Sequence, residues 1–133
     1  MSPNSSVETS AARAAGIYAQ ANIENAPPTK IVRLLYQGAM RFLDIAATCD
    51  PRQPNSKFDY WTGRADDIVV ELRLGLQPEH APEIADSLSE LYLFVETSIS
   101  RARRERDPKH LIGARLVLAR LLEAWTELDI GKA

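Results

Sequence analysis

Residues 29–49 read TKIVRLLYQGAMRFLDIAATC, the stretch that decides the fold of this 133-residue chain. Its polar side chains recur at every third or fourth position and form one narrow stripe. They are Lys30, Arg33, Gln37, Arg41, Asp44 and Thr48. This spacing predicts a helix, because one helical turn takes about 3.6 residues. A surface helix usually buries a single apolar stripe. This one is apolar or small over most of its circumference, which predicts contacts on most of its sides.

Prolines divide the rest of the chain into further stretches of helix-forming residues. They stand at positions 3, 27, 28, 51, 54, 78, 82 and 108. Proline is poorly tolerated inside a helix, because it lacks an N–H and clashes with the preceding turn. Apolar side chains at helical spacing predict helices over about 59–77 and 82–105. A last helix is expected to start with Asp107 as its N-cap and Pro108 at its first helical position, where proline is favoured. It is expected to end near Gly131.

Four amphipathic helices of similar length predict an all-α fold, an antiparallel four-helix bundle. The link over 76–82 is short, so the helices on either side of it are expected to be antiparallel neighbours. Residues 1–15 are rich in Ser, Ala and Thr and predict a flexible N-terminal arm, with a short helix around 11–20 as the alternative. We expect residues 16–133 to form a single helical-bundle domain.

Composition and charge exclude several classes of protein. Lys and Arg number 16 and Asp and Glu 18, so the net charge is −2, which argues against nucleic acid as the main partner. The one basic run, 101–106, falls in the last turns of a predicted helix, where cations complement the helix dipole. The single cysteine, Cys49, excludes an intrachain disulfide. No apolar run is long enough to span a membrane and no signal peptide is recognisable, so we expect no membrane insertion and a cytoplasmic location.

The sequence offers no constellation of catalytic or metal-binding residues, so we expect neither an enzyme nor a cofactor or metal. The two histidines, His80 and His110, lie in or beside predicted loops. His110 leaves one alternative open, a histidine phosphotransfer-type helical bundle. The stretch from His110 to Gly113 faintly resembles the histidine-bearing helix of such domains. It is one residue too short and contains no lysine, which makes this the minor alternative.

The chain carries more apolar side chains than four buried helix faces need. Those that stand off the main faces of their helices are Val70, Leu74, Leu93, Phe94, Leu116 and Val117. Large exposed apolar patches usually mark a partner site. On a helical bundle, such a site suits an amphipathic partner segment. The alternative is a structural helical dimer that pairs through the same surface.

The stretch from Tyr18 to Ala47 carries a more specific pattern. Tyr18 precedes Ala26-Pro27-Pro28, and Leu35-Tyr36-Gln37-Gly38-Ala39 with Phe42-Leu43 follows farther along. Ala124-Trp125 stands near the end of the chain. Over about residues 16–128, this order resembles the FliS family of flagellar secretion chaperones. The family has a serine where Pro27 stands, so we expect Thr29 to cap the helix instead.

This resemblance implies a function for the chain. Family members bind the C-terminal segment of flagellin in the bacterial cytosol, prevent its premature polymerisation and assist its delivery to the flagellar type III secretion apparatus. The resemblance also implies the flagellar export gate and a co-chaperone as partners, and a monomer or weak homodimer. The candidate residues for binding flagellin, or for covering the groove that binds it, are Ile17, Tyr18, Ile23, Leu34, Leu35, Tyr36, Met40 and Leu43.

The N-terminal segment before the proline pair, including Ile17, Tyr18 and Ile23, is expected to act as a lid on that groove. Ile17, Tyr18 and Ile23 are large apolar groups in a small, polar segment, and the proline pair that follows would turn it back along the bundle. Deleting residues 1–24 should then raise the affinity for flagellin and lower the solubility of the free protein. If these side chains only complete the core, the deletion destabilises the fold instead. Amide exchange with a saturating flagellin C-terminal peptide separates the two, because a displaced lid must lose protection at Tyr18 and Ile23.

Overall fold

The computed structural model describes residues 28–79 and 81–132, which form four α-helices and a single 3-10 turn. The helices are α2 (Pro28–Ala47), α3 (Phe58–Leu74), α4 (Pro82–Glu105) and α5 (Leu111–Lys132), and the 3-10 helix η1 (Pro108–His110) immediately precedes α5. These ranges contain no strand. The prediction of an all-α helical bundle is therefore confirmed. Within the same ranges, no helix is long and apolar enough to cross a membrane.

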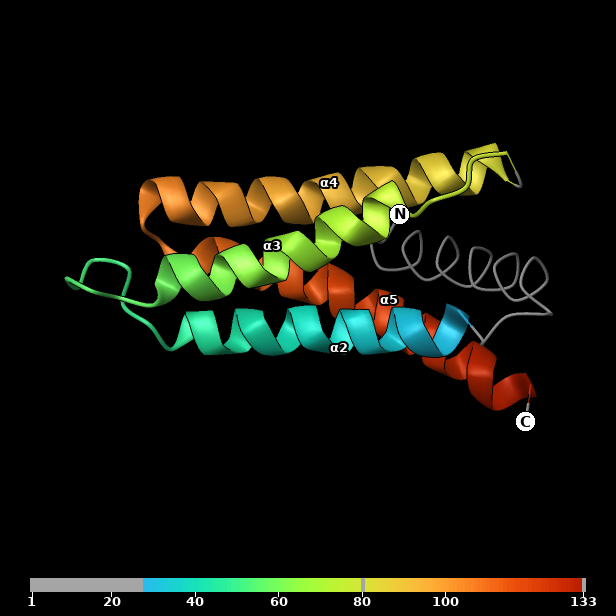
Figure 1. The fold of residues 1–133 in the computed structure, drawn as a ribbon, viewed down its shortest axis with the longest axis horizontal. Coiled ribbons are helices and arrows are strands. Elements are labelled where there is room, and N and C mark those ends of the chain that lie inside the picture. Colours follow the sequence, from blue (N-terminus) through green and yellow to red (C-terminus); the bar gives the residue numbers. More distant parts are fainter. Residues whose placement is uncertain (1–27, 80, 133) are drawn as a thin grey trace.

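The four helices form a ring in chain order. Helix α2 packs against α3 and α5, and α4 packs against the same two helices. Successive helices run in alternating directions along the long axis of the molecule (Figure 1). Each helix therefore has two neighbours and one outer face, and the core lies along the axis that the four helices share.

Proline stands at the start of α2, α4 and η1, with two differences from expectation. Helix α2 begins at Pro28, so Thr29 lies in its first turn and the prediction that it caps the helix is wrong. The first helical position suits proline, because an N–H there would have no partner within the helix. Asp107 does act as a cap, and its Oδ1 accepts a hydrogen bond from the Lys109 N–H at 3.0 Å. The turn that it caps is 3-10, and α5 itself begins three residues later, at Leu111.

A hydrogen-bonded aromatic cluster joins three helices in the core. Tyr36 of α2, Tyr92 of α4 and Trp125 of α5 are each at most 2% exposed. The Tyr36 hydroxyl lies 2.5 Å from the Tyr92 hydroxyl and accepts a hydrogen bond from the Trp125 indole N–H at 3.1 Å. Burying a polar group costs free energy unless it is hydrogen-bonded. The cluster therefore fixes how α2, α4 and α5 sit against one another.

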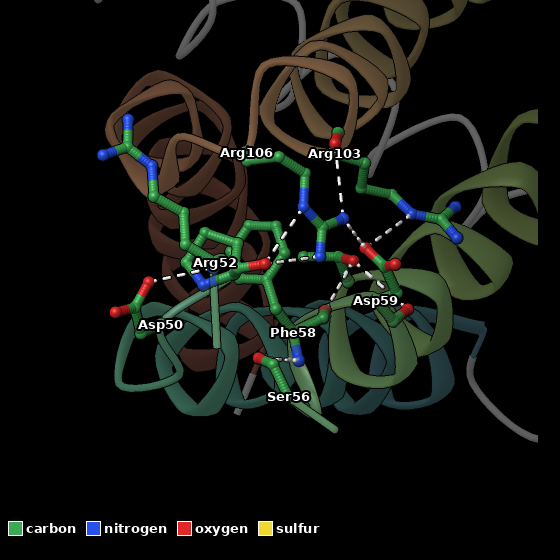
Figure 2. Close-up of polar contacts among 9 residues, drawn as sticks. Asp50, Arg52, Ser56, Phe58, Asp59, Arg103 and Arg106 are labelled. Atoms are coloured by element: carbon green, nitrogen blue, oxygen red, sulfur yellow. Dashed lines mark hydrogen bonds and ion pairs between the residues drawn. The ribbon is translucent and has the colours of Figure 1, made fainter. Parts of the chain in front are cut away.

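The loop between α2 and α3 is fastened to the end of α4 by one side chain, that of Arg106 (Figure 2). Its guanidinium donates to the Pro51 carbonyl from Nε at 3.1 Å and from Nη2 at 2.6 Å. Nη1 donates to Asp59 Oδ1 at 2.7 Å, and the guanidinium carbon lies 5.9 Å from the centre of the Phe58 ring. Arg106 itself ends α4 with a left-handed backbone, at a φ of 53°. One residue of the basic run 101–106 therefore makes specific contacts with the α2–α3 loop and α3, in addition to the interaction of the run with the helix dipole.

Candidate functional site

The apolar surplus expected from the sequence is present on the described surface. The exposed large side chains are Ile31, Leu34, Tyr60, Leu74, Leu93, Phe94, Ile112 and Leu116. They include four of the six residues that stood off the main helix faces, whereas Val70 and Val117 are half-buried. The exposed set is spread over all four helices.

A mostly apolar hollow of about 460 Å³ lies between α2 and α5. Met40 of α2 and Leu122 of α5 supply apolar walls, and Gln37 and Arg41 supply polar ones. Apolar walls with a few polar groups are the usual composition of a binding site in a helical bundle. The hollow therefore combines the two features needed to hold an amphipathic segment.

Two residues that line this hollow form a bidentate ion pair between the helices. Arg115 Nε lies 2.6 Å from Asp44 Oδ1, and Nη2 lies 3.2 Å from Oδ2. The hydrogen bond to Asp44 raises the pKa of Arg115 above its ordinary value and so favours its charged form. Both side chains are about half exposed. The pair therefore links α2 to α5 through two residues that line the hollow.

The candidate residues of α2 differ widely in exposure. Tyr36 and Leu43 are 0% and 1% exposed and belong to the core. Leu35 and Met40 are half-buried, and Leu34 is 57% exposed. Of these five, Met40 is the one that lines the hollow. In this conformation a partner can reach Leu34 and Met40, whereas Tyr36 and Leu43 support the helices beneath.

Three further candidates, Ile17, Tyr18 and Ile23, lie outside the described residues, as does the predicted arm. Their roles stay predictions. Sequence reasoning missed the ion pair between Asp44 and Arg115, which stand 71 positions apart. Helical periodicity shows which face of a helix is polar, but it does not show which residue of another helix that face meets.

His110 is poorly placed for phosphotransfer. It lies in the 3-10 turn, its side chain is 16% exposed, and its Nε2 is 3.1 Å from Glu105 Oε1. A hydrogen bond from Arg101, and to a lesser extent one from His110, holds the pKa of Glu105 below its usual range. This carboxylate is therefore ionised at neutral pH. An incoming phosphate would meet that negative charge at the ring nitrogen. Among the described residues, no group of His, Cys, Asp or Glu side chains is arranged to hold a metal ion.

The sequence matches a known protein family over most of its length. The family model described as flagellar protein FliS matches residues 10–132. The chain belongs to the FliS family. The resemblance over about 16–128 is therefore confirmed.

Curated relatives agree with this assignment to FliS. The flagellar secretion chaperone FliS of Vibrio cholerae is 32% identical over 104 residues, which cover 77% of this chain and 76% of the relative. The FliS of Campylobacter jejuni is 32% identical over 109 residues, covering 82% and 84%. FliSB of Pseudomonas aeruginosa is 27% identical over 106 residues, covering 80% and 84%. These relatives are chaperones rather than enzymes, which confirms the expectation of a non-enzymatic chain.

Proposed function

We propose that this FliS chain is a cytoplasmic export chaperone that binds the C-terminal segment of flagellin. In this role it prevents premature polymerisation and assists delivery to the flagellar type III secretion apparatus. The relatives named flagellar secretion chaperones support the general role. The observation that carries the binding step is the mostly apolar hollow between α2 and α5.

The chemistry of the hollow suits a segment that folds as it binds. An amphipathic helix could bury its apolar face against Met40 and Leu122, while its polar side meets Gln37 and Arg41. The exposed Leu34 stands one helical turn before Gln37 on α2 and would extend the contact along that helix. Ordering a disordered client costs free energy, which the burial of a large apolar area offsets.

We also propose that the protein is a monomer or weak homodimer that engages the flagellar export gate and a co-chaperone. An obligate dimer buries a large, continuous and mostly apolar face. The exposed apolar side chains of the described residues are instead distributed over all four helices. This distribution favours a chaperone over the structural dimer, and contacts with several different partners over a single permanent one.

Replacing Met40 with glutamate is expected to raise the Kd for a flagellin C-terminal peptide at least about 10-fold. The reason is that the new carboxylate would lose hydration against the apolar client, and a loss of about 1.4 kcal/mol already gives that factor. Leu34→Glu should weaken binding as well, by less, because its side chain is more exposed. Isothermal titration calorimetry measures the Kd of both variants for a C-terminal peptide of a flagellin encoded in the same genome.

The matched control is Leu93→Glu, which adds the same charge at a residue of α4 that is 45% exposed. It should bind like the unaltered chain. If Met40→Glu keeps both its thermal midpoint and its affinity, the client does not occupy this hollow. If the unaltered chain binds no flagellin peptide, the chaperone proposal itself fails.

Sedimentation velocity on the same samples tests the oligomeric state, and a tight dimer that never takes up peptide would support the structural alternative.

A further inference from the structure

A second surface, separate from the α2–α5 hollow, lies where the end of α2 meets the start of α3. The rings of Tyr60 and Trp61 are stacked with their centres 4.9 Å apart. Trp61 in turn packs against Phe42 of α2, at 5.5 Å between ring centres. Tyr60 is 45% exposed, and the other two rings are half-buried. These three rings, with the cations of Lys57 and Arg64, are called the aromatic patch.

The two cations of the aromatic patch lie against its rings. The guanidinium carbon of Arg64 is 5.2 Å from the centre of the Phe42 ring and 5.9 Å from that of Tyr60. Arg64 Nη1 also donates to the Tyr60 hydroxyl at 3.2 Å. The Lys57 ammonium lies 5.9 Å from the centre of the Tyr60 ring. A cation over an aromatic face is attracted by the ring quadrupole, so both charges are held on the patch.

In the described part of the chain, these two cations differ in their ion pairing from several other arginines. Within the described ranges, neither Lys57 nor Arg64 lies at salt-bridge distance from a carboxylate. By comparison, Arg73 pairs with Glu96, and Arg106 pairs with Asp59. The chain as a whole carries a net charge of −2. Among the described residues, the two cations of the aromatic patch are therefore held by the rings and not by a carboxylate.

We propose that the aromatic patch is a docking surface for an acidic amphipathic segment of a partner protein. Tyr, Trp and Arg are the side chains most enriched among residues that dominate binding energy at protein interfaces. The rings are already stacked in the free protein, so little side-chain freedom is lost when a partner covers them. Carboxylates beside the apolar side chains of the partner would complement Lys57 and Arg64.

Single-stranded nucleic acid could also stack on exposed rings. Its affinity, however, depends on several phosphate contacts at once, and the aromatic patch supplies two cations. An acidic protein segment needs fewer charges, because its apolar side chains contribute the remaining binding energy. The charge on the patch thus favours a protein partner. This inference does not depend on where flagellin binds.

Two synthetic amphipathic peptides of equal length and with the same leucine face test the proposal. One carries glutamate at its flanking positions and the other carries lysine. The chain has two tryptophans, so its NMR spectrum has two indole N–H signals. The glutamate peptide should shift the signal of Trp61 and leave that of the buried Trp125 in place. The lysine peptide should bind at least about 5-fold more weakly, and added salt should reduce the difference.

Arg64→Gln should raise the Kd of the glutamate peptide at least about 5-fold, because it removes one complementary charge. Arg104→Gln is the matched control, since Arg104 is exposed on α4 and should not change the Kd. Met40→Glu should also leave this titration unchanged, which separates it from the test of the flagellin site. The proposal is overturned if neither peptide shifts the Trp61 signal, if both shift it equally, or if Arg104→Gln weakens binding as much as Arg64→Gln. It is also overturned if oligothymidylate shifts that signal and the glutamate peptide does not.

Discussion

Replacing Tyr36 with alanine is expected to lower the free energy of unfolding by about 3–5 kcal/mol, the usual cost of truncating a buried aromatic side chain. The ring is 0% exposed. Its hydroxyl is hydrogen-bonded to the hydroxyl of Tyr92 and accepts a hydrogen bond from the indole N–H of Trp125. Such a loss is a large part of the stability of a small domain, which is about 5–15 kcal/mol. Tyr36→Phe keeps the ring and should cost about 1–3 kcal/mol, the price of disrupting a buried hydrogen-bond network. Urea denaturation followed by circular dichroism measures both changes.

The two variants also decide how Tyr36, a candidate for flagellin binding, contributes to function. If Tyr36 acts through the core, Tyr36→Phe lowers stability and leaves the affinity for the flagellin peptide unchanged. Leu34→Ala is the control on the same helix, and at 57% exposed it should change stability by no more than about 0.5 kcal/mol. Unaltered stability together with weaker peptide binding in Tyr36→Phe would show instead that the hydroxyl contacts the client.

The positions of the helices followed from the sequence because they depend on local chemistry. Helix α4 runs over Pro82–Glu105, the span that proline placement and apolar spacing predicted. Leu88, Val95 and Ile99, apolar side chains at helical spacing along it, are buried. Prolines, capping residues and apolar spacing of about 3.6 residues all depend on one or two helical turns of sequence. The bounds that they set can therefore be predicted without the tertiary structure.

The candidate site was predicted less completely, because it depends on how the helices meet. Periodicity placed Met40 and Tyr36 on the same apolar helix, yet Met40 lines the hollow and Tyr36 lies in the core. The rotation of α2 about its axis decides between these environments, and neighbouring helices fix that rotation. The aromatic patch was missed for a related reason, since Phe42 and Trp61 meet only after the chain has turned.

Replacing Arg106 with alanine is expected to lower the free energy of unfolding by about 2–3 kcal/mol, because hydrogen bonds made by a charged group contribute more than neutral ones. The variant removes two donors to the Pro51 carbonyl and one to Asp59 (Figure 2). Pro51 is itself buried, so its carbonyl cannot simply turn to solvent. Thermal unfolding followed by circular dichroism measures the change. Amide exchange should also show faster opening of the α2–α3 loop than of the helices.

A glycine variant separates the side chain of Arg106 from its backbone. At a φ of 53°, alanine keeps a left-handed conformation that costs about 1–2 kcal/mol and that glycine adopts freely. Arg106→Gly should therefore be more stable than Arg106→Ala by about 1 kcal/mol and still less stable than the unaltered chain. Arg104→Ala, two residues earlier and exposed, serves as the control and should stay within about 0.5 kcal/mol. If Arg106→Ala is no less stable than Arg104→Ala, then the bond to Pro51 does not hold the loop. In that case the packing of Phe58, which is 0% exposed at the start of α3, must fix the loop instead.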